Sequence, residues 1–206
     1  GIRDHCVTGV QTCALPILEP LHALQVHHRD VKPDNVLLDR SHRHAVLCDF
    51  GSSRRTSALS EASSQPVACS MRYMAPEVFL NENHGIECDI YSWGILSHQI
   101  LSQATKPLFG GRIATDGFTP DTYRIMVCQQ GLRPTCTDVS ASENNNGISN
   151  TVVSKECLVL LAKSWKFDPS ERLPLRSIKR QLDRFLQDEK MLLEAHNLAR
   201  CGMMFI

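Results

Sequence analysis

The residues of this chain that could do chemistry are concentrated in one polar stretch and one short motif behind it. The stretch is residues 27–35, read His His Arg Asp Val Lys Pro Asp Asn, and the motif is Asp49 Phe50 Gly51. A carboxylate can accept a proton, and an ammonium group can neutralise an anion. Carboxylate and amide oxygens are the ligands that a hard cation such as Mg²⁺ prefers. Each residue type alone is common on surfaces, so only the joint pattern is informative.

Two short apolar runs are expected to bring the two parts of this pattern together. Residues 35–38 (Asn Val Leu Leu) and 45–48 (Ala Val Leu Cys) have the character of strands, and the polar residues 39–44 separate them. Such an arrangement predicts a β-hairpin. Because a hairpin brings the start of its first strand beside the end of its second, we expect Asn35 and Asp49 to lie together.

The two motifs together resemble the catalytic loop and the metal-binding motif of eukaryotic protein kinases. Every defined place of the family pattern is matched, by His28, Arg29, Asp30, Lys32, Asn35, Asp49, Phe50 and Gly51. Phosphoryl transfer needs little covalent help from a protein, because its main requirements are a hydroxyl held in line and neutralised phosphoryl charge. The resemblance therefore implies transfer of the γ-phosphate of ATP to a protein hydroxyl.

The resemblance also implies a role for each central residue. Asp30 is expected to accept or orient the proton of the substrate hydroxyl, and Lys32 to meet the transferring phosphate. Asn35 and Asp49 are expected to hold Mg²⁺, and Leu37 to contact ATP from below. The implied cofactors are therefore ATP and Mg²⁺. Lys32 at this place resembles serine/threonine kinases, so the implied partner is a protein substrate bearing Ser or Thr.

A Ser-rich stretch, residues 52–70, resembles the activation loop of the family. Arg29 is the cation that such a loop would bind if it were phosphorylated, with Thr56 among the candidate sites. A plain surface loop is the alternative for any single site. The stretch ends in residues 69–77, read Cys Ser Met Arg Tyr Met Ala Pro Glu, which resemble the family's substrate-floor motif. Ser70 stands where Thr is usual and still supplies a hydroxyl to reach Asp30.

Two further features are expected to support the site. Residues 89–101 are largely apolar, which predicts a helix buried in the core. Asp89, at its start, resembles the residue that fixes the backbone of the catalytic loop. Arg172 resembles the arginine that pairs with the Glu of the Ala Pro Glu motif, so we expect a buried bidentate ion pair with Glu77.

The expected fold class is mainly α: a protein-kinase-like C-terminal lobe, built as a helical bundle with a small β-hairpin that carries the catalytic and metal-binding loops. The lobe is expected over residues 18–187, and residues 188–206 form a tail without a functional interpretation. No Gly-x-Gly occurs in the 206 residues, so the Gly-rich loop of the family's N-terminal lobe is expected to be missing here. The polar residues 137–150 are expected to be an insertion.

The first stretch, residues 1–17, does not fit the pattern that follows it. Residues 7–17, read Val Thr Gly Val Gln Thr Cys Ala Leu Pro Ile, resemble the in-frame translation of a common sequencing adapter. We therefore expect residues 1–17 to be non-native. A secretory signal is the alternative, but the stretch lacks a basic start and a sufficient apolar core.

Composition narrows the expected partners. Lys+Arg and Asp+Glu are equal at 22 each, so no nucleic acid or anionic membrane surface is expected as a partner. No apolar run approaches the length needed to span a membrane. The nine cysteines include no Cys-x-x-Cys pair and are expected to be reduced, which favours a cytoplasmic protein. The sequence leaves the oligomeric state open.

The subfamily and the activity of this piece are further expectations. Residues 131–134 and 165–172 resemble the tyrosine-kinase-like branch, to which many serine/threonine kinases belong. The rival hypothesis is a pseudokinase or scaffold lobe that binds partners without transfer. The intact Asp30, Lys32, Asn35 and Asp49 argue against it. A third possibility is a fragment that is inactive on its own because the N-terminal lobe is absent.

Overall fold

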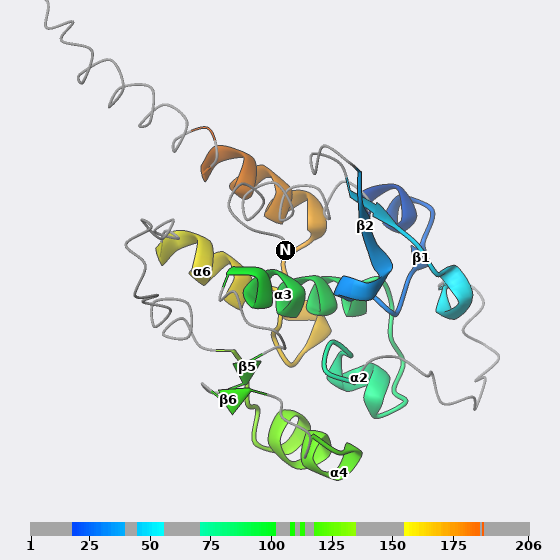
Figure 1. Cartoon of the computed structure of the whole chain (residues 1–206), viewed down its shortest axis with the longest axis vertical. Coiled ribbons are helices and arrows are strands. Elements are labelled where there is room, and N and C mark those ends of the chain that lie inside the picture. Colours follow the sequence, from blue (N-terminus) through cyan, green and yellow to red (C-terminus); the bar gives the residue numbers. More distant parts are fainter. Residues whose placement is uncertain are drawn as a thin grey trace, which may run out of the picture.

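The computed structural model describes residues 18–39, 45–55, 71–101, 108–109, 112–113, 118–134, 155–185 and 187 (Figure 1). Several sequence predictions lie outside these described residues. They concern the stretch 1–17, the loop residues Thr56 and Ser70, the insertion 137–150 and the tail 188–206.

The described elements are mainly helical, with three small antiparallel strand pairs, which confirms the mainly α expectation and agrees with a lobe of the predicted kind. Helices without a label cover residues 18–23 and 175–185. The strands are β1 (Val26–His27), β2 (Val36–Leu38), β3 (Ala45–Leu47), β4 (Arg54–Arg55), β5 (Leu108–Phe109) and β6 (Arg112–Ile113). The labelled helical elements are η1 (Pro33–Asn35), η2 (Phe50–Ser52), α2 (Pro76–Phe79), α3 (Glu87–Leu101), α4 (Pro120–Tyr123), η4 (Arg124–Gln129), α6 (Lys155–Ala162) and η5 (Pro169–Glu171).

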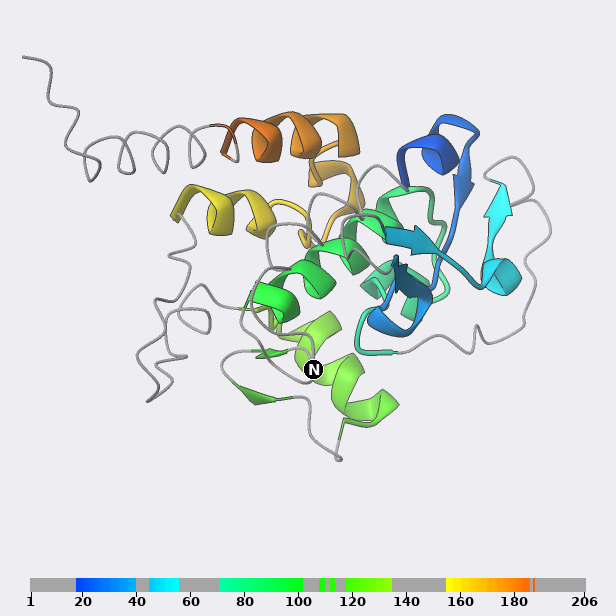
Figure 2. The ribbon, with the colours of Figure 1, turned by 45° about the horizontal axis from the view of Figure 1, so that its top comes forward.

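Helix α3 is the central element of the fold, as its apolar sequence predicts. Its residues Tyr91, Trp93 and Ile95 are fully buried, and almost all its other side chains are buried too. Figures 1 and 2 show α3 in the middle, with α6 and the helix 175–185 on one side and α4 on the other. A helix that is apolar on every face must be covered on every face, because exposed apolar surface is unfavourable in water.

One glycine allows α3 to approach its neighbour closely. A Cβ atom added at Gly94 would lie 1.9 Å from Ser164 Oγ and 2.9 Å from Ser164 Cβ. Ser164 is fully buried in the turn after α6, and its hydroxyl donates to the Leu161 carbonyl at 2.6 Å. The absence of a side chain at Gly94 therefore lets the backbone of α3 pack directly on this turn.

The predicted hairpin is present, and two other strand pairs were not predicted. Strands β2 and β3 pair antiparallel with Val36 opposite Leu47 and Leu37 opposite Val46. Strand β1 pairs with β4, and β5 pairs with β6. The first helix ends at residue 23, and Leu24 lies in the turn that follows it and is exposed.

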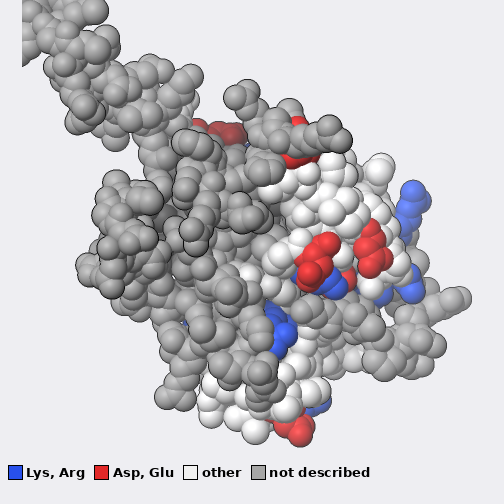
Figure 3. Space-filling model, in the orientation of Figure 1, with Lys and Arg blue, Asp and Glu red and all other residues white. Residues whose placement is uncertain are grey.

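The surface of the described part mixes charges of both signs. On the face drawn in Figure 3, basic and acidic side chains lie near one another over the described residues. Within this part of the chain, no helix combines the length and the apolar character that crossing a bilayer requires.

Candidate functional site

The hairpin places Asn35 beside Asp49, as the sequence predicts. The Cys48 amide donates to the Asn35 carbonyl at 2.9 Å, so the ladder extends one residue beyond the paired strands. This bond brings Asn35, which immediately precedes β2, next to Cys48, which immediately precedes Asp49. The catalytic loop and the Asp49 motif are therefore joined through the backbone.

Asp30, Lys32 and Asn35 form one connected cluster. Lys32 Nζ lies 2.7 Å from Asp30 Oδ2, and Asn35 Nδ2 donates to the same oxygen at 2.9 Å. Asn35 Nδ2 also donates to the Asp30 carbonyl at 2.8 Å. The side chains of Asp30 and Asn35 are buried, with 8% and 5% of their surfaces exposed. Two donors on one carboxylate oxygen hold the Asp30 side chain in a single orientation.

Asp49 presents its carboxylate at the surface beside this cluster. Its backbone is left-handed, at φ 61° and ψ 76°, which is uncommon for a residue other than glycine. Its Oδ1 accepts from the Gly51 amide at 3.2 Å, which helps to hold the turn into η2. Residues held in a left-handed backbone conformation tend to occur at functional sites.

The donor set at Asn35 and Asp49 fits Mg²⁺. The Asn35 amide nitrogen is bonded to Asp30, which leaves the amide oxygen as the atom that could face a cation. The Asp49 carboxylate supplies further hard oxygens. Among the described residues, no three His, Cys, Asp or Glu side chains gather as a metal site of their own. The two residues therefore fit an ion that takes its other ligands from substrate phosphates and water.

Leu37 lies on the outer face of the hairpin. It stands opposite Val46, and the two side chains are 54% and 59% exposed. Exposed apolar side chains paired across a hairpin offer a contact surface for an apolar group. The predicted contact of Leu37 with the nucleotide stays a prediction.

Asp89 fixes the backbone of the catalytic loop from the start of α3. Its fully buried carboxylate accepts from the amides of His28 and Arg29, both at 2.8 Å. Arg29 has a left-handed backbone, at φ 69°, and these two bonds hold it there. His22 Nε2 also contacts this carboxylate, at 3.0 Å from Asp89 Oδ2. The spacing of residues in the sequence does not indicate this role of His22.

The remaining loop residues connect the catalytic loop to the Asp49 motif. His28 Nε2 lies 3.1 Å from the Cys48 carbonyl, and the His28 ring meets the Phe50 ring edge-on at 5.0 Å. Arg29 Nε donates to the Ser52 carbonyl at 2.6 Å. Arg29 is thus tied to the first residues of the predicted activation loop. Its binding of a phosphorylated Thr56 stays a prediction, because Thr56 lies outside the described residues.

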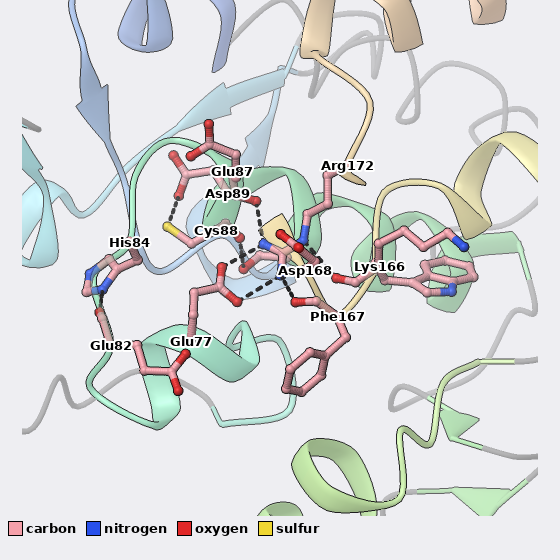
Figure 4. Close-up of polar contacts among 12 residues, drawn as sticks. Glu77, Glu82, His84, Glu87, Cys88, Asp89, Lys166, Phe167, Asp168 and Arg172 are labelled. Carbon is pink, nitrogen blue, oxygen red and sulfur yellow. Dashed lines mark hydrogen bonds and ion pairs between the residues drawn. The ribbon is translucent and has the colours of Figure 1, made fainter. Parts of the chain in front are cut away.

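Arg172 and Glu77 form the buried bidentate pair that the sequence predicts (Figure 4). The two guanidinium nitrogens donate to the two Glu77 oxygens at 2.6 and 2.8 Å. The same guanidinium donates to the carbonyls of Lys166, Glu87 and Phe167, and it lies 5.1 Å from the centroid of the Tyr91 ring. Both side chains are almost fully buried. This pair therefore ties α2 to η5 and to the start of α3.

Hydroxyl groups hold Tyr73 and Met74 of the substrate-floor motif onto α3 and α4. Tyr73 donates to Gln99 Oε1 at 2.5 Å, and Ser92 donates to the Tyr73 carbonyl at 2.7 Å. The Tyr123 hydroxyl donates to the Met74 carbonyl at 2.5 Å. Burial raises the pKa of Tyr73 to about 12, so its hydroxyl keeps its proton and remains a donor. The sequence indicates the motif but not these anchors.

Stability is expected to fall in acid because of His27. Its imidazole is fully buried on β1, and the His84 ring lies 5.5 Å away. Burial lowers the pKa of His27 below its usual 6.5; His84 and Arg29 act in the same direction, whereas Asp89 and a backbone hydrogen bond with Gly85 oppose it. The unfolded chain therefore binds more protons below pH 6.5, so the free energy of unfolding decreases as pH falls from 6.5 toward the lowered pKa.

Urea unfolding of the 206-residue chain at pH 7.5 and 5.5 measures this effect. We expect the free energy of unfolding of the wild type to be lower at pH 5.5 than at pH 7.5, because the unfolded chain binds the additional proton. The variant His27→Leu, which cannot take up a proton at this position, should lose less. An equal loss in both proteins would show that other groups cause the pH dependence.

Comparison with known proteins agrees with this geometry. The protein kinase domain family matches residues 8–182. The chain is 30% identical to human mitogen-activated protein kinase kinase kinase 7 over 162 residues, which are 77% of this chain and 23% of that protein. It is 28% identical to a putative serine/threonine-protein kinase/receptor of Acanthamoeba polyphaga mimivirus over 174 residues, which are 83% of this chain and 9% of that protein.

A third relative is 3-phosphoinositide-dependent protein kinase B of Dictyostelium discoideum, 28% identical over 165 residues, 79% of this chain and 16% of that protein. The chain spans less than a quarter of the length of each of these curated relatives. The family match runs through the catalytic cluster, the Asp49 motif, the Asp89 clamp and the Arg172 ion pair. This chain belongs to the protein kinase domain family.

Proposed function

We propose that this chain is the C-terminal lobe, over residues 18–187, of a serine/threonine protein kinase of the tyrosine-kinase-like branch. The observation that carries the proposal is the shared Asp30 oxygen, to which Lys32 and Asn35 both donate. This arrangement places a carboxylate, a cation and a side-chain amide of the kind that can bind a metal ion within one hydrogen-bonded cluster. The mimivirus and human relatives are both named as protein kinases, which is the class of activity proposed here.

In the proposed reaction, Asp30 orients a Ser or Thr hydroxyl and takes its proton as the hydroxyl oxygen bonds to the γ-phosphorus. The bond from that phosphorus to the bridging oxygen of ADP breaks at the same time. Lys32 lies beside Asp30 and lowers the cost of negative charge on the transferring group. Mg²⁺, when held by Asn35 and Asp49, supplies charge neutralisation for the phosphates of ATP.

The remaining expectations belong to the same proposal. The kinase acts in the cytoplasm on protein substrates, and the free thiols of the described Cys48, Cys88, Cys128 and Cys157 support a reducing compartment. Residues 1–17 are non-native, and residues 188–206 are a tail outside the lobe. A genomic exon that encodes residues 7–17 in frame with Leu18 would contradict the first of these two assignments.

Transfer of radiolabel from ATP to a generic protein substrate tests the function. The full-length kinase that contains this chain should label the substrate, and phosphoamino-acid analysis should place the label on Ser or Thr. Label on Tyr alone would contradict the proposed specificity. Failure of the full-length protein to transfer phosphate, while it still binds partners, would favour a pseudokinase or scaffold instead.

A further inference from the structure

A basic groove lies away from the catalytic cluster, along the helix 175–185. It has a volume of about 380 Å³, and polar or charged residues from this helix and from the first helix line it. Figure 2 shows the helix 175–185 at the outside of the fold, with its N-terminal end toward the helix 18–23. Leu175, Ile178 and Leu182 of this helix are buried in the core. The groove therefore lies along the opposite face of the helix.

Three arginines form a ladder on this helix. Arg176, Arg180 and Arg184 follow one another at intervals of four residues, are exposed and line the groove. Side chains at this spacing lie on one face of a helix, with about 5–6 Å between their Cβ atoms. Like charges at this spacing repel one another and weaken the helix unless an anion lies across them.

The other charged groups in the groove balance only part of this ladder. Arg176 Nε lies 3.6 Å from Glu19 Oε1, and Lys179 Nζ lies 3.0 Å from Asp183 Oδ2. Within the described residues, Arg180 and Arg184 have no ion-pair partner. Among the described residues that line the groove, four cations stand against two carboxylates, which leaves two net positive charges.

We propose that this groove docks an extended acidic segment of a partner protein, with Asp or Glu at alternate positions. Alternate side chains of an extended chain point the same way and are spaced by about 6.6 Å. That spacing matches the distance between successive arginines of the ladder. Two carboxylates could then each receive the planar guanidinium of Arg180 or Arg184.

The shape and lining of the groove favour a peptide over other anions. Among the described residues that line this groove, no apolar side chain is available to insert among lipids. Duplex nucleic acid needs many phosphate contacts, whereas Glu19 and Asp183 would repel phosphates here. An extended peptide can place its acidic side chains on the arginines and avoid both carboxylates.

Fluorescence anisotropy with the full 206-residue chain tests the proposal. The probe is a fluorescein-labelled peptide of alternating glutamate and serine, and the same peptide with lysine for glutamate is the control. We expect the acidic peptide to bind and its affinity to fall with added salt. The charge reversal Arg180→Glu with Arg184→Glu should weaken binding at least about tenfold. The single variants Arg180→Gln and Arg184→Gln should give intermediate losses.

The matched control is Lys163→Glu with Lys166→Glu, which reverses two exposed charges outside the groove. It should change the affinity by less than about twofold, and circular dichroism should show the same helix content in all variants. Peptide binding that survives the double arginine reversal, or an equal loss in the lysine control, would overturn the proposal. Sedimentation of the chain with phosphatidylserine vesicles without binding to the acidic peptide would overturn it too, because the groove would then recognise lipid.

Discussion

Replacing Asp30 with Asn is expected to reduce phosphoryl transfer by the full-length kinase by about a hundredfold or more, with little change in nucleotide binding. The substitution keeps the size of the side chain and an oxygen that can accept from Lys32 and Asn35, so the loop should keep its shape. It removes the carboxylate that is proposed to take the hydroxyl proton. The loss should therefore appear in kcat and not in the KM for ATP.

Asp34→Asn is the matched control, because Asp34 is an exposed carboxylate in the same loop. This variant makes the same chemical change four residues away and should retain nearly all the activity. Asp49→Ala should differ from both, since loss of the proposed metal ligand would impair nucleotide binding and rate together. Steady-state kinetics with radiolabelled ATP separates the three variants. Full activity in Asp30→Asn would contradict the role proposed for Asp30.

Truncating Arg172 to Ala is expected to destabilise the fold by about 3–5 kcal/mol, the scale found when one partner of a buried ion pair is removed. The change leaves the Glu77 carboxylate buried without its cation. It also removes the donor from the carbonyls of Lys166, Glu87 and Phe167. The midpoint and slope of urea unfolding, followed by circular dichroism, measure the loss.

Two comparisons make this result specific. Arg176→Ala removes the same side chain from a position that is 83% exposed, where its ion pair with Glu19 is worth at most about 1 kcal/mol. The double variant Arg172→Met with Glu77→Leu removes both charges but still leaves the three carbonyls without a donor. It should therefore recover part of the stability, not all of it. A loss below about 1 kcal/mol in Arg172→Ala would show that the pair contributes little.

Much of the site could be predicted from the sequence because its parts are encoded locally. Asp30, Lys32 and Asn35 lie within six residues, so their spacing alone places them in one loop. Two short apolar runs on either side of a polar turn predict the hairpin that brings Asn35 to Asp49, and the structure has that hairpin. The apolar run 89–101 likewise predicts the buried helix α3, which the structure has over Glu87–Leu101.

Other contacts were decided only by the tertiary structure. His22 reaches Asp89 across 67 positions of the chain, and β1 pairs with β4 across the whole catalytic loop. The close approach at Gly94 depends on where the turn after α6 packs. Spacing in a sequence specifies which face of a strand or helix a side chain occupies, but not which distant element covers that face. The sequence by itself therefore indicated the candidate catalytic residues and their nearest supports. The packing of distant elements onto α3 decided how Asp89 holds the loop of those residues and how Arg172 ties α2 to the start of α3.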